Sequence, residues 1–139
     1  MPDSFDLQRF VDAQASVIDR VLAELRAGQK RSHWMWFVFR QIEGLGFSAM
    51  AQRYSISSLD ETKAYLAHPV LGPRLRECTQ LVLDIEEKSA HAIFGSPDDL
   101  KFRSSVTLFD LVSPNDVFAA ALKKYFGGEA DAATLARVG

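Results

Sequence analysis

Apolar residues recur every three or four positions along most of this chain, and this spacing restricts the possible folds more than any other feature. The clearest example spans residues 6–27. It is followed by Gly28, a residue type that commonly ends helices. We therefore expect one long amphipathic helix over residues 6–27. Its apolar members are Leu7, Phe10, Val11, Val17, Ile18, Val21, Leu22 and Leu25.

Short polar signals divide the rest of the chain into further helices. Ser58 and Glu61 match a capping box, in which two side chains satisfy free N–H groups at a helix start. The Ser-Pro pairs at 96–97 and 113–114 combine a capping hydroxyl with a proline suited to the first helical turn. The expected helices cover residues 32–42, 48–54, 58–68, 73–85, 90–94, 97–112, 114–126 and 131–137.

These segments predict an all-α fold, a single compact multi-helix domain of about seven to nine helices over residues 1–139. The length is typical of one domain that buries a substantial core without a disulfide or a structural metal. Hydrophobic residues make up 47% of the chain and charged residues 24%, which is typical of a globular protein and excludes a disordered one. Short turns join the helices, with no linker or internal repeat.

Charge and cysteine content narrow the partners and the location. The formal net charge of -2 gives no basic surface, so we expect no nucleic-acid partner. No apolar run is long enough to span a membrane, so we expect no membrane partner either. Cys78 is the lone cysteine, which fits a reducing compartment, and we expect a cytoplasmic protein. The histidines lack metal-ligand spacing, so no metal or cofactor is expected, and the oligomeric state stays open.

The aromatic segment at residues 33–39 is the most unusual stretch of the sequence. It contains His33, Trp34 and Trp36 and continues into Arg40 and Gln41. Aromatic clusters mostly form cores, and core packing is the favoured interpretation of this segment. Aromatic walls beside cationic and amide groups can also hold a flat anionic ligand. Both interpretations hold if one edge of the helix lines a pocket.

A second cluster combines a lysine with hydroxyls on one helical face. Lys101 and Ser104 share this face and could bind an anion, or they could form a solvated face with the hydroxyl bonded to the helix backbone. The prolines that flank residues 68–74 favour a rigid corner between helices. Arg74 lies close to the expected start of the next helix, where an external anion is conceivable.

The sequence closely resembles the family known as domain of unknown function 1810, which includes the Rv1873-like proteins. The resemblance implies an all-α fold and no established activity, substrate or cofactor. The family pattern usually reads Phe-Pro-Gln where this chain has Phe39, Arg40 and Gln41, so we expect a longer helix here and a positive charge beside the suspected pocket. The matching stretches are residues 5–10, 30–37, 44–46, 65–75, 93–95, 98–101 and 104–109.

Three functional hypotheses follow from these clusters. The first is a module that binds a small anionic, nucleotide-like ligand or a peptide. The second is an enzyme that acts on such a ligand with His33 as the acid or base, since histidine suits that role near neutral pH. The third is a helical protein-interaction domain. The candidate ligand-binding residues are His33, Trp34, Trp36, Arg40, Gln41, Lys101 and Ser104.

Overall fold

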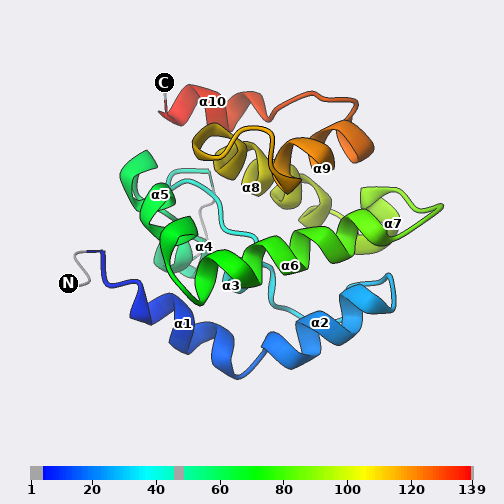
Figure 1. Ribbon diagram of the computed structural model, residues 1–139, viewed down its shortest axis with the longest axis horizontal. Helices are drawn as coiled ribbons and strands as arrows, with labels where there is room; N and C mark the ends of the chain where they lie inside the picture. The colour runs from blue at the N-terminus through cyan, green and yellow to red at the C-terminus, as the bar shows by residue number, and fades with distance from the viewer. Residues whose placement is uncertain (1–4, 46–48, 139) are drawn as a thin grey trace.

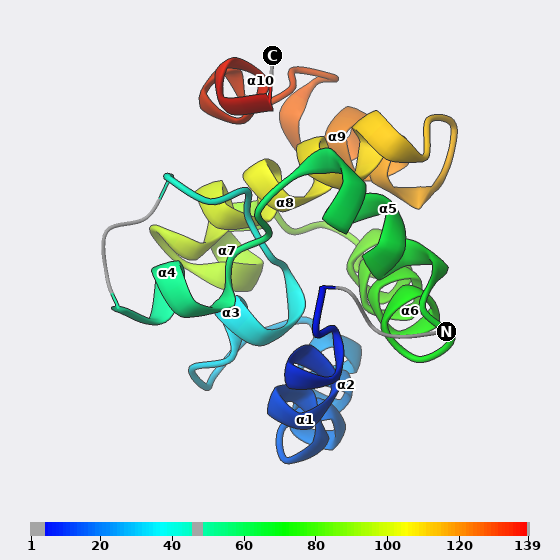
Figure 2. The same cartoon turned by 90° about the vertical axis from the view of Figure 1, so that its left-hand side faces the viewer.

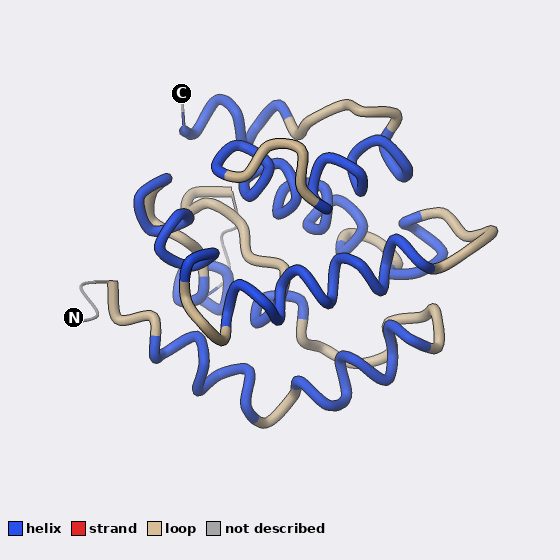
Figure 3. The backbone as a smooth tube through the Cα atoms, viewed as in Figure 1, coloured by secondary structure: helices blue, strands red, loops and turns tan. Residues whose placement is uncertain are grey.

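Helices are the regular elements of the computed structural model, which describes residues 5–45 and 49–138 (Figures 1 and 3). The all-α prediction is confirmed. Within the described residues there is no strand, only an isolated bridge between Ile42 and Ile56. The ten helices are α1 (Gln8–Ala15), α2 (Ile18–Arg26), α3 (Met35–Val38), α4 (Ala49–Tyr54), α5 (Leu59–Ala67), α6 (Leu71–Asp84), α7 (Ala90–Phe94), α8 (Asp98–Val112), α9 (Val117–Phe126) and α10 (Ala132–Val138).

The single long helix expected over residues 6–27 is wrong, because α1 ends at Ala15 and α2 begins at Ile18. This break also explains why the described part of the chain has ten helices rather than seven to nine. The apolar period continues through the break, so the sequence does not mark it. The two halves pack on different partners, α1 against α3 and α2 against α6, and the bend lets each half bury its own apolar side.

The helix expected over residues 32–42 is also wrong, since α3 covers only Met35–Val38. At its start, the hydroxyl of Ser32 donates to the carboxylate of Glu24 instead of capping the helix. At its end, Phe39 adopts a non-helical ψ of 82°. The carbonyl of Gln41 then accepts a hydrogen bond from the Ile56 amide at 2.9 Å. Arg40 therefore does not prolong the helix as we expected.

The local signals around α4 to α7 are largely confirmed. Ser48, the expected start of α4, lies outside the described residues. The Ser58 hydroxyl accepts from the Glu61 amide at 3.1 Å, as in a capping box, but the Glu61 carboxylate accepts from the Ser57 amide at 2.7 Å rather than from Ser58. Helix α5 ends before His68 and α7 ends before Gly95, both as predicted.

The two Ser-Pro pairs predict the neighbourhood of a helix start but not the capping residue. Helix α8 begins at Asp98 without a cap from Ser96, because the carbonyls of Gly95 and Pro97 accept the amides of its first turn. Before α9 the cap is Asp116, whose carboxylate accepts from the Val117 amide at 2.7 Å. Ser113 instead donates its hydroxyl to Asp116 at 2.8 Å.

Helix α6 crosses the middle of the molecule and separates two groups of helices (Figure 1). The pair α1 and α2 lies on one side, and α8, α9 and α10 lie on the other. In the orthogonal view α3 and α4 lie opposite α5 and α6 (Figure 2). The aromatic segment enters the core that these groups enclose. The largest fully buried side chains include Phe10, Trp34, Phe39, Arg40, Tyr65, Phe102, Phe109 and Phe118.

The carbonyl end of α6 is closed by side chains from α9. Lys124 donates from Nζ to the carbonyl oxygens of Leu83 at 2.5 Å and Ile85 at 2.7 Å. The hydroxyl of Tyr125 donates to the Val82 carbonyl. The last carbonyls of a helix have no partner within it, and a cation favours the negative end of the helix dipole, so these contacts complete α6.

Candidate functional site

A small hollow forms where three segments of the chain meet, and we call it the Arg40 depression. The bridge between Ile42 and Ile56 brings the segment after α3 alongside the segment after α4, and α8 closes the remaining side. The hollow has a volume of about 10 Å³, which is close to the space that one water molecule needs. Its lining residues are Trp36, Phe39, Arg40, Gln41, Tyr54, Ser55 and Lys101.

Arg40 is buried, with 1% of its surface exposed. Its Nε donates to the Tyr65 hydroxyl at 3.3 Å, its Nη1 to the Tyr54 carbonyl at 2.9 Å and its Nη2 to the Phe37 carbonyl at 3.1 Å. The guanidinium also lies 3.8 Å from the centre of the Phe10 ring. A guanidinium has five N–H donors, so these three bonds leave two donors for further partners.

The charge of Arg40 is not matched by a carboxylate within the described part of the chain, where its hydrogen-bond acceptors are neutral. Burial lowers the pKa of its guanidinium, and the nearby Arg9 lowers it further. The nearest ion pair joins Arg9 to Glu61 at 3.1 Å. Buried charges in proteins are normally paired, so Arg40 is an exception that calls for an explanation.

The position of Arg40 is fixed by a buried polar network. The side-chain amide of Gln14 donates to the Phe37 carbonyl at 2.6 Å and to the Tyr65 hydroxyl at 3.0 Å. These are two of the three oxygens that also accept from Arg40. Arg74 in turn donates to the Gln14 amide oxygen at 3.4 Å. The network joins α1, α5 and α6 to the segment that follows α3, so the guanidinium is held by the core itself.

Lys101 supplies a second cation at the depression. Its Nζ lies 4.7 Å from the centre of the Trp36 ring, within the range of a cation–π interaction. The same ammonium is 3.6 Å from the carboxylate of Asp98, which pairs more closely with Lys30 at 2.8 Å. The structure thus brings together Trp36, Arg40, Gln41 and Lys101, four of the seven residues that the sequence nominates.

The other three nominated residues lie elsewhere. His33 is exposed and does not line the depression. Trp34 is fully buried, and its Nε1 donates to the Glu24 carboxylate at 2.9 Å. Ser104 is buried, and its hydroxyl bonds to the Leu100 carbonyl at 3.1 Å and to the Asp131 carboxylate at 3.0 Å. These contacts place Trp34 in the core and give Ser104 a part in the connection between α8 and α10.

Glu24 anchors the loop that precedes α3. Its carboxylate accepts from the amides of Arg31 at 2.6 Å and Ser32 at 3.0 Å, from the Ser32 hydroxyl, and from Trp34. Burial alone would raise the pKa of Glu24, but these hydrogen bonds lower it to about 2. The carboxylate therefore stays ionised and organises the first half of the aromatic segment.

Sequence reasoning missed Tyr54 and Ser55 as lining residues and Tyr65 as a support for Arg40. Tyr54 ends α4 and stacks edge-on against Phe37, with ring centres 5.0 Å apart. No local motif marks either tyrosine. Only the bridge near Ser55 places them beside the aromatic segment, and an isolated bridge leaves no pattern in a sequence.

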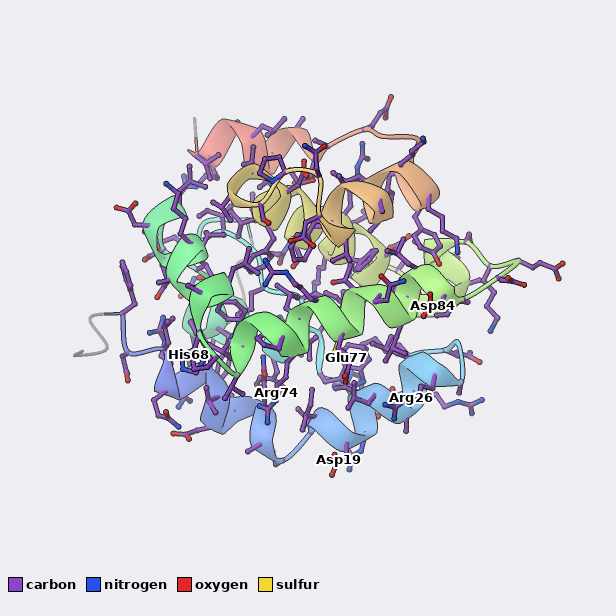
Figure 4. The ribbon with its side chains drawn as sticks, viewed as in Figure 1. Asp19, Arg26, His68, Arg74, Glu77 and Asp84 are labelled. Carbon is purple, nitrogen blue, oxygen red and sulfur yellow. The ribbon has the colours of Figure 1, made fainter. Side chains whose placement is uncertain are left out.

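The corner at residues 68–74 has a structural role. The Nδ1 of His68 accepts from the Val70 amide at 3.1 Å and the Leu71 amide at 3.3 Å, which satisfies donors at the start of α6. Figure 4 shows His68 at this turn and Arg74 further along α6, close to α1. The bond from Arg74 to Gln14 occupies part of its guanidinium. The rigid-corner interpretation therefore accounts for these residues.

Cys78 and the acidic side chains offer no second reactive site. Cys78 is buried, and burial raises the pKa of its thiol to about 12, so the nucleophilic thiolate is suppressed. Across the described residues, His, Cys, Asp and Glu side chains form no group of three that could hold a metal ion. The helices of the described ranges are also too short or too polar to cross a membrane.

Two wider hollows are open to solvent, and their polar groups are already engaged. One, of about 360 Å³, lies at the start of α5, where Arg137 donates to the Glu43 carbonyl at 3.1 Å. The other, of about 490 Å³, lies between the ends of α2 and α6, where Lys88 donates to the Gly28 carbonyl at 3.0 Å. Neither is lined by a buried charge, so the Arg40 depression is the stronger candidate despite its size.

The sequence matches the family described as "Protein of unknown function (DUF1810)" over residues 4–138. The chain belongs to this family. Among solved structures, it resembles the crystal structure at 1.38 Å of the conserved hypothetical protein Rv1873 from Mycobacterium tuberculosis, with 57% identity and a TM-score of 0.96. The match covers 98% of each chain, so the DUF1810 fold extends over essentially the whole of this protein. No curated protein matches the sequence.

Proposed function

We propose that this DUF1810 protein binds a small anionic ligand at the Arg40 depression, through Arg40 and Lys101, with Trp36 beside the bound group. The buried guanidinium of Arg40 is the observation that carries the proposal. Its described hydrogen-bond partners are three neutral oxygens, and it reaches the surface only through the depression. An anion in the depression would supply the missing counter-charge.

The dimensions of the depression limit what enters it. A volume of about 10 Å³ admits one oxygen atom of a ligand, not a base or a sugar. The rest of the ligand would lie outside, against the partly exposed Trp36 ring and the Lys101 ammonium. This arrangement fits a ligand whose charged end group binds and whose organic part lies on the surface, such as a nucleotide or the end of a peptide.

The proposal is limited to binding. A general acid or base must lie within hydrogen-bond reach of the reacting group, and His33 lies outside the residues that line the depression. The acids and bases that do line it are Arg40, Lys101 and Tyr54. An arginine stays protonated in proteins and cannot take up a proton. A charge-neutralising role for these residues needs no proton transfer.

Thermal unfolding with a panel of anions tests the proposal. The panel contains benzoate, phenyl sulfate, phenyl phosphate, AMP and ADP-ribose. A ligand at 100 times its Kd adds about 2.7 kcal/mol of stability when it binds only the folded protein, and the Tm rises accordingly. We expect at least one compound to raise the Tm in a saturable way.

A matched pair of variants links that shift to the depression. Lys101→Met removes the charge and keeps a flexible apolar side chain beside Trp36, and we expect it to reduce the shift strongly. Lys63→Met makes the same change at an exposed position on α5 and should keep the full shift. The proposal is wrong if no anion changes the Tm, or if both variants respond as the unmodified protein does.

A further inference from the structure

We infer that the anionic group bound at the Arg40 depression is a phosphate monoester in its dianionic form, rather than a carboxylate or a sulfate ester. This inference rests on the proposed function and specifies the chemical class of its ligand. Three features of the site carry it: the number of cations that line the depression, the neutral surroundings of those cations, and the number of oxygens that they can engage.

Two cations and no carboxylate line the depression. Arg40 and Lys101 are both among its lining residues, and the remaining lining side chains are neutral at pH 7. Asp98 is the described carboxylate closest to Lys101, at 3.6 Å, but Lys30 lies nearer to it, at 2.8 Å. Lys30 therefore takes up most of the charge of Asp98, and Lys101 keeps most of its own. A ligand with two negative charges matches the two lining cations.

The donors at the site also suit three oxygens better than two. The two remaining donors of Arg40 lie at the inner end, where one oxygen fits, and the Lys101 ammonium lies at the rim above Trp36. A phosphoryl group carries three acceptor oxygens in a tetrahedral arrangement. It can direct one oxygen inward to Arg40 and keep the others at the rim for Lys101. A planar carboxylate has only two oxygens to divide between these positions.

Phenyl phosphate and phenyl sulfate provide a direct test, because they share a shape and differ by one charge at pH 7.5. Calorimetric titration of the full chain should give an affinity for phenyl phosphate at least about tenfold above that for phenyl sulfate. The reason is that the second charge faces two partly desolvated cations. Benzoate should bind at least as weakly as phenyl sulfate. Glycerol phosphate should bind more weakly than phenyl phosphate, because it lacks a ring to lie beside Trp36.

The Lys101→Gln variant checks the assignment of the second charge. We expect it to lower the affinity for phenyl phosphate much more than that for phenyl sulfate, so that the ratio falls to about two or less. Lys63→Gln should leave the ratio unchanged. Equal affinities for the two compounds in the unmodified protein would overturn the inference while the proposed function stands. An absence of binding by every compound in the panel would overturn both.

Discussion

Glu24 and Arg40 are two buried charges on either side of the aromatic segment, and the protein treats them differently. Glu24 accepts four hydrogen bonds from groups in the loop that it anchors, and it lines none of the three hollows described above. Arg40 donates to three neutral oxygens and borders a hollow that also holds Lys101. The carboxylate is satisfied by the fold, whereas the guanidinium keeps donors and charge to spare. The difference separates a structural charge from a charge available to a ligand.

Truncation of the carboxylate should have the largest effect. Glu24→Ala leaves two amides, a hydroxyl and the Trp34 indole without their acceptor, and we expect it to lower the free energy of unfolding by about 4 kcal/mol. Urea denaturation followed by circular dichroism measures the change. Glu24→Gln keeps one acceptor oxygen and should cost roughly half as much. A loss below about 1 kcal/mol in Glu24→Ala would show that Glu24 does not organise the segment.

Acid should reproduce much of that loss without a mutation. The folded-state pKa of Glu24 is about 2, below its ordinary value of 4.5, so its ionised form stabilises the folded protein. That contribution is fully present above about pH 5 and disappears as the pH falls through 4.5 towards 2, a loss of about 3 kcal/mol. Urea denaturation across this range measures it. The Glu24→Gln variant should lack this part of the pH dependence, and identical curves for the two proteins would contradict the assignment.

Replacement of the buried cation should cost less than loss of the buried anion. Arg40→Met removes a charge that has no described carboxylate partner and keeps an apolar contact with Phe10. We expect a loss of about 1.5 kcal/mol, from the oxygens of Tyr54 and Phe37 that lose a donor. The ligand-dependent rise in Tm should vanish. A loss as large as that of Glu24→Ala would mean that Arg40 is chiefly structural, and the comparison would fail.

The smallest effect on stability should come from Lys101. Its pair with Asp98 is partly exposed and long, at 3.6 Å, so Lys101→Met should change the free energy of unfolding by less than about 0.5 kcal/mol. The same variant should lose most of its ligand response. This separation of stability from binding would sharpen the contrast with Glu24, for which stability is the whole effect. A variant with reduced stability and unchanged binding would reverse the assignment.

Local chemistry predicted the parts of the fold that are held together locally. The cap formed by Ser58 depends on residues three positions apart, and the helix that ends before Gly95 needs only its own chain neighbours. The break before Ile18 and the short α3 depend instead on distant partners. Glu24 draws the donors of Ser32 away from the helix, and nothing in the sequence near Ser32 announces this bond.

The candidate site divides in the same way. Trp36, Arg40 and Gln41 are near neighbours, so the sequence could group them, and the expected positive charge beside the hollow is present. The sequence also nominated Lys101 on the basis of its residue type, and the fold brings it to Trp36. Trp34 and Trp36 could not be told apart, because a helix longer than α3 was expected there. Their separation into core and rim follows from the bond between Trp34 and Glu24.

The closure of α6 by Lys124 and Tyr125 has a consequence for synthesis of the chain on the ribosome. Tyr125 follows its acceptor Val82 by 43 positions, and Lys124 follows Ile85 by 39. A nascent chain that stops before these residues carries α6 with its last carbonyls unclosed, although the whole helix has already been translated. The central helix is therefore completed only when α9 emerges, so premature termination in this interval should yield a chain that is readily degraded.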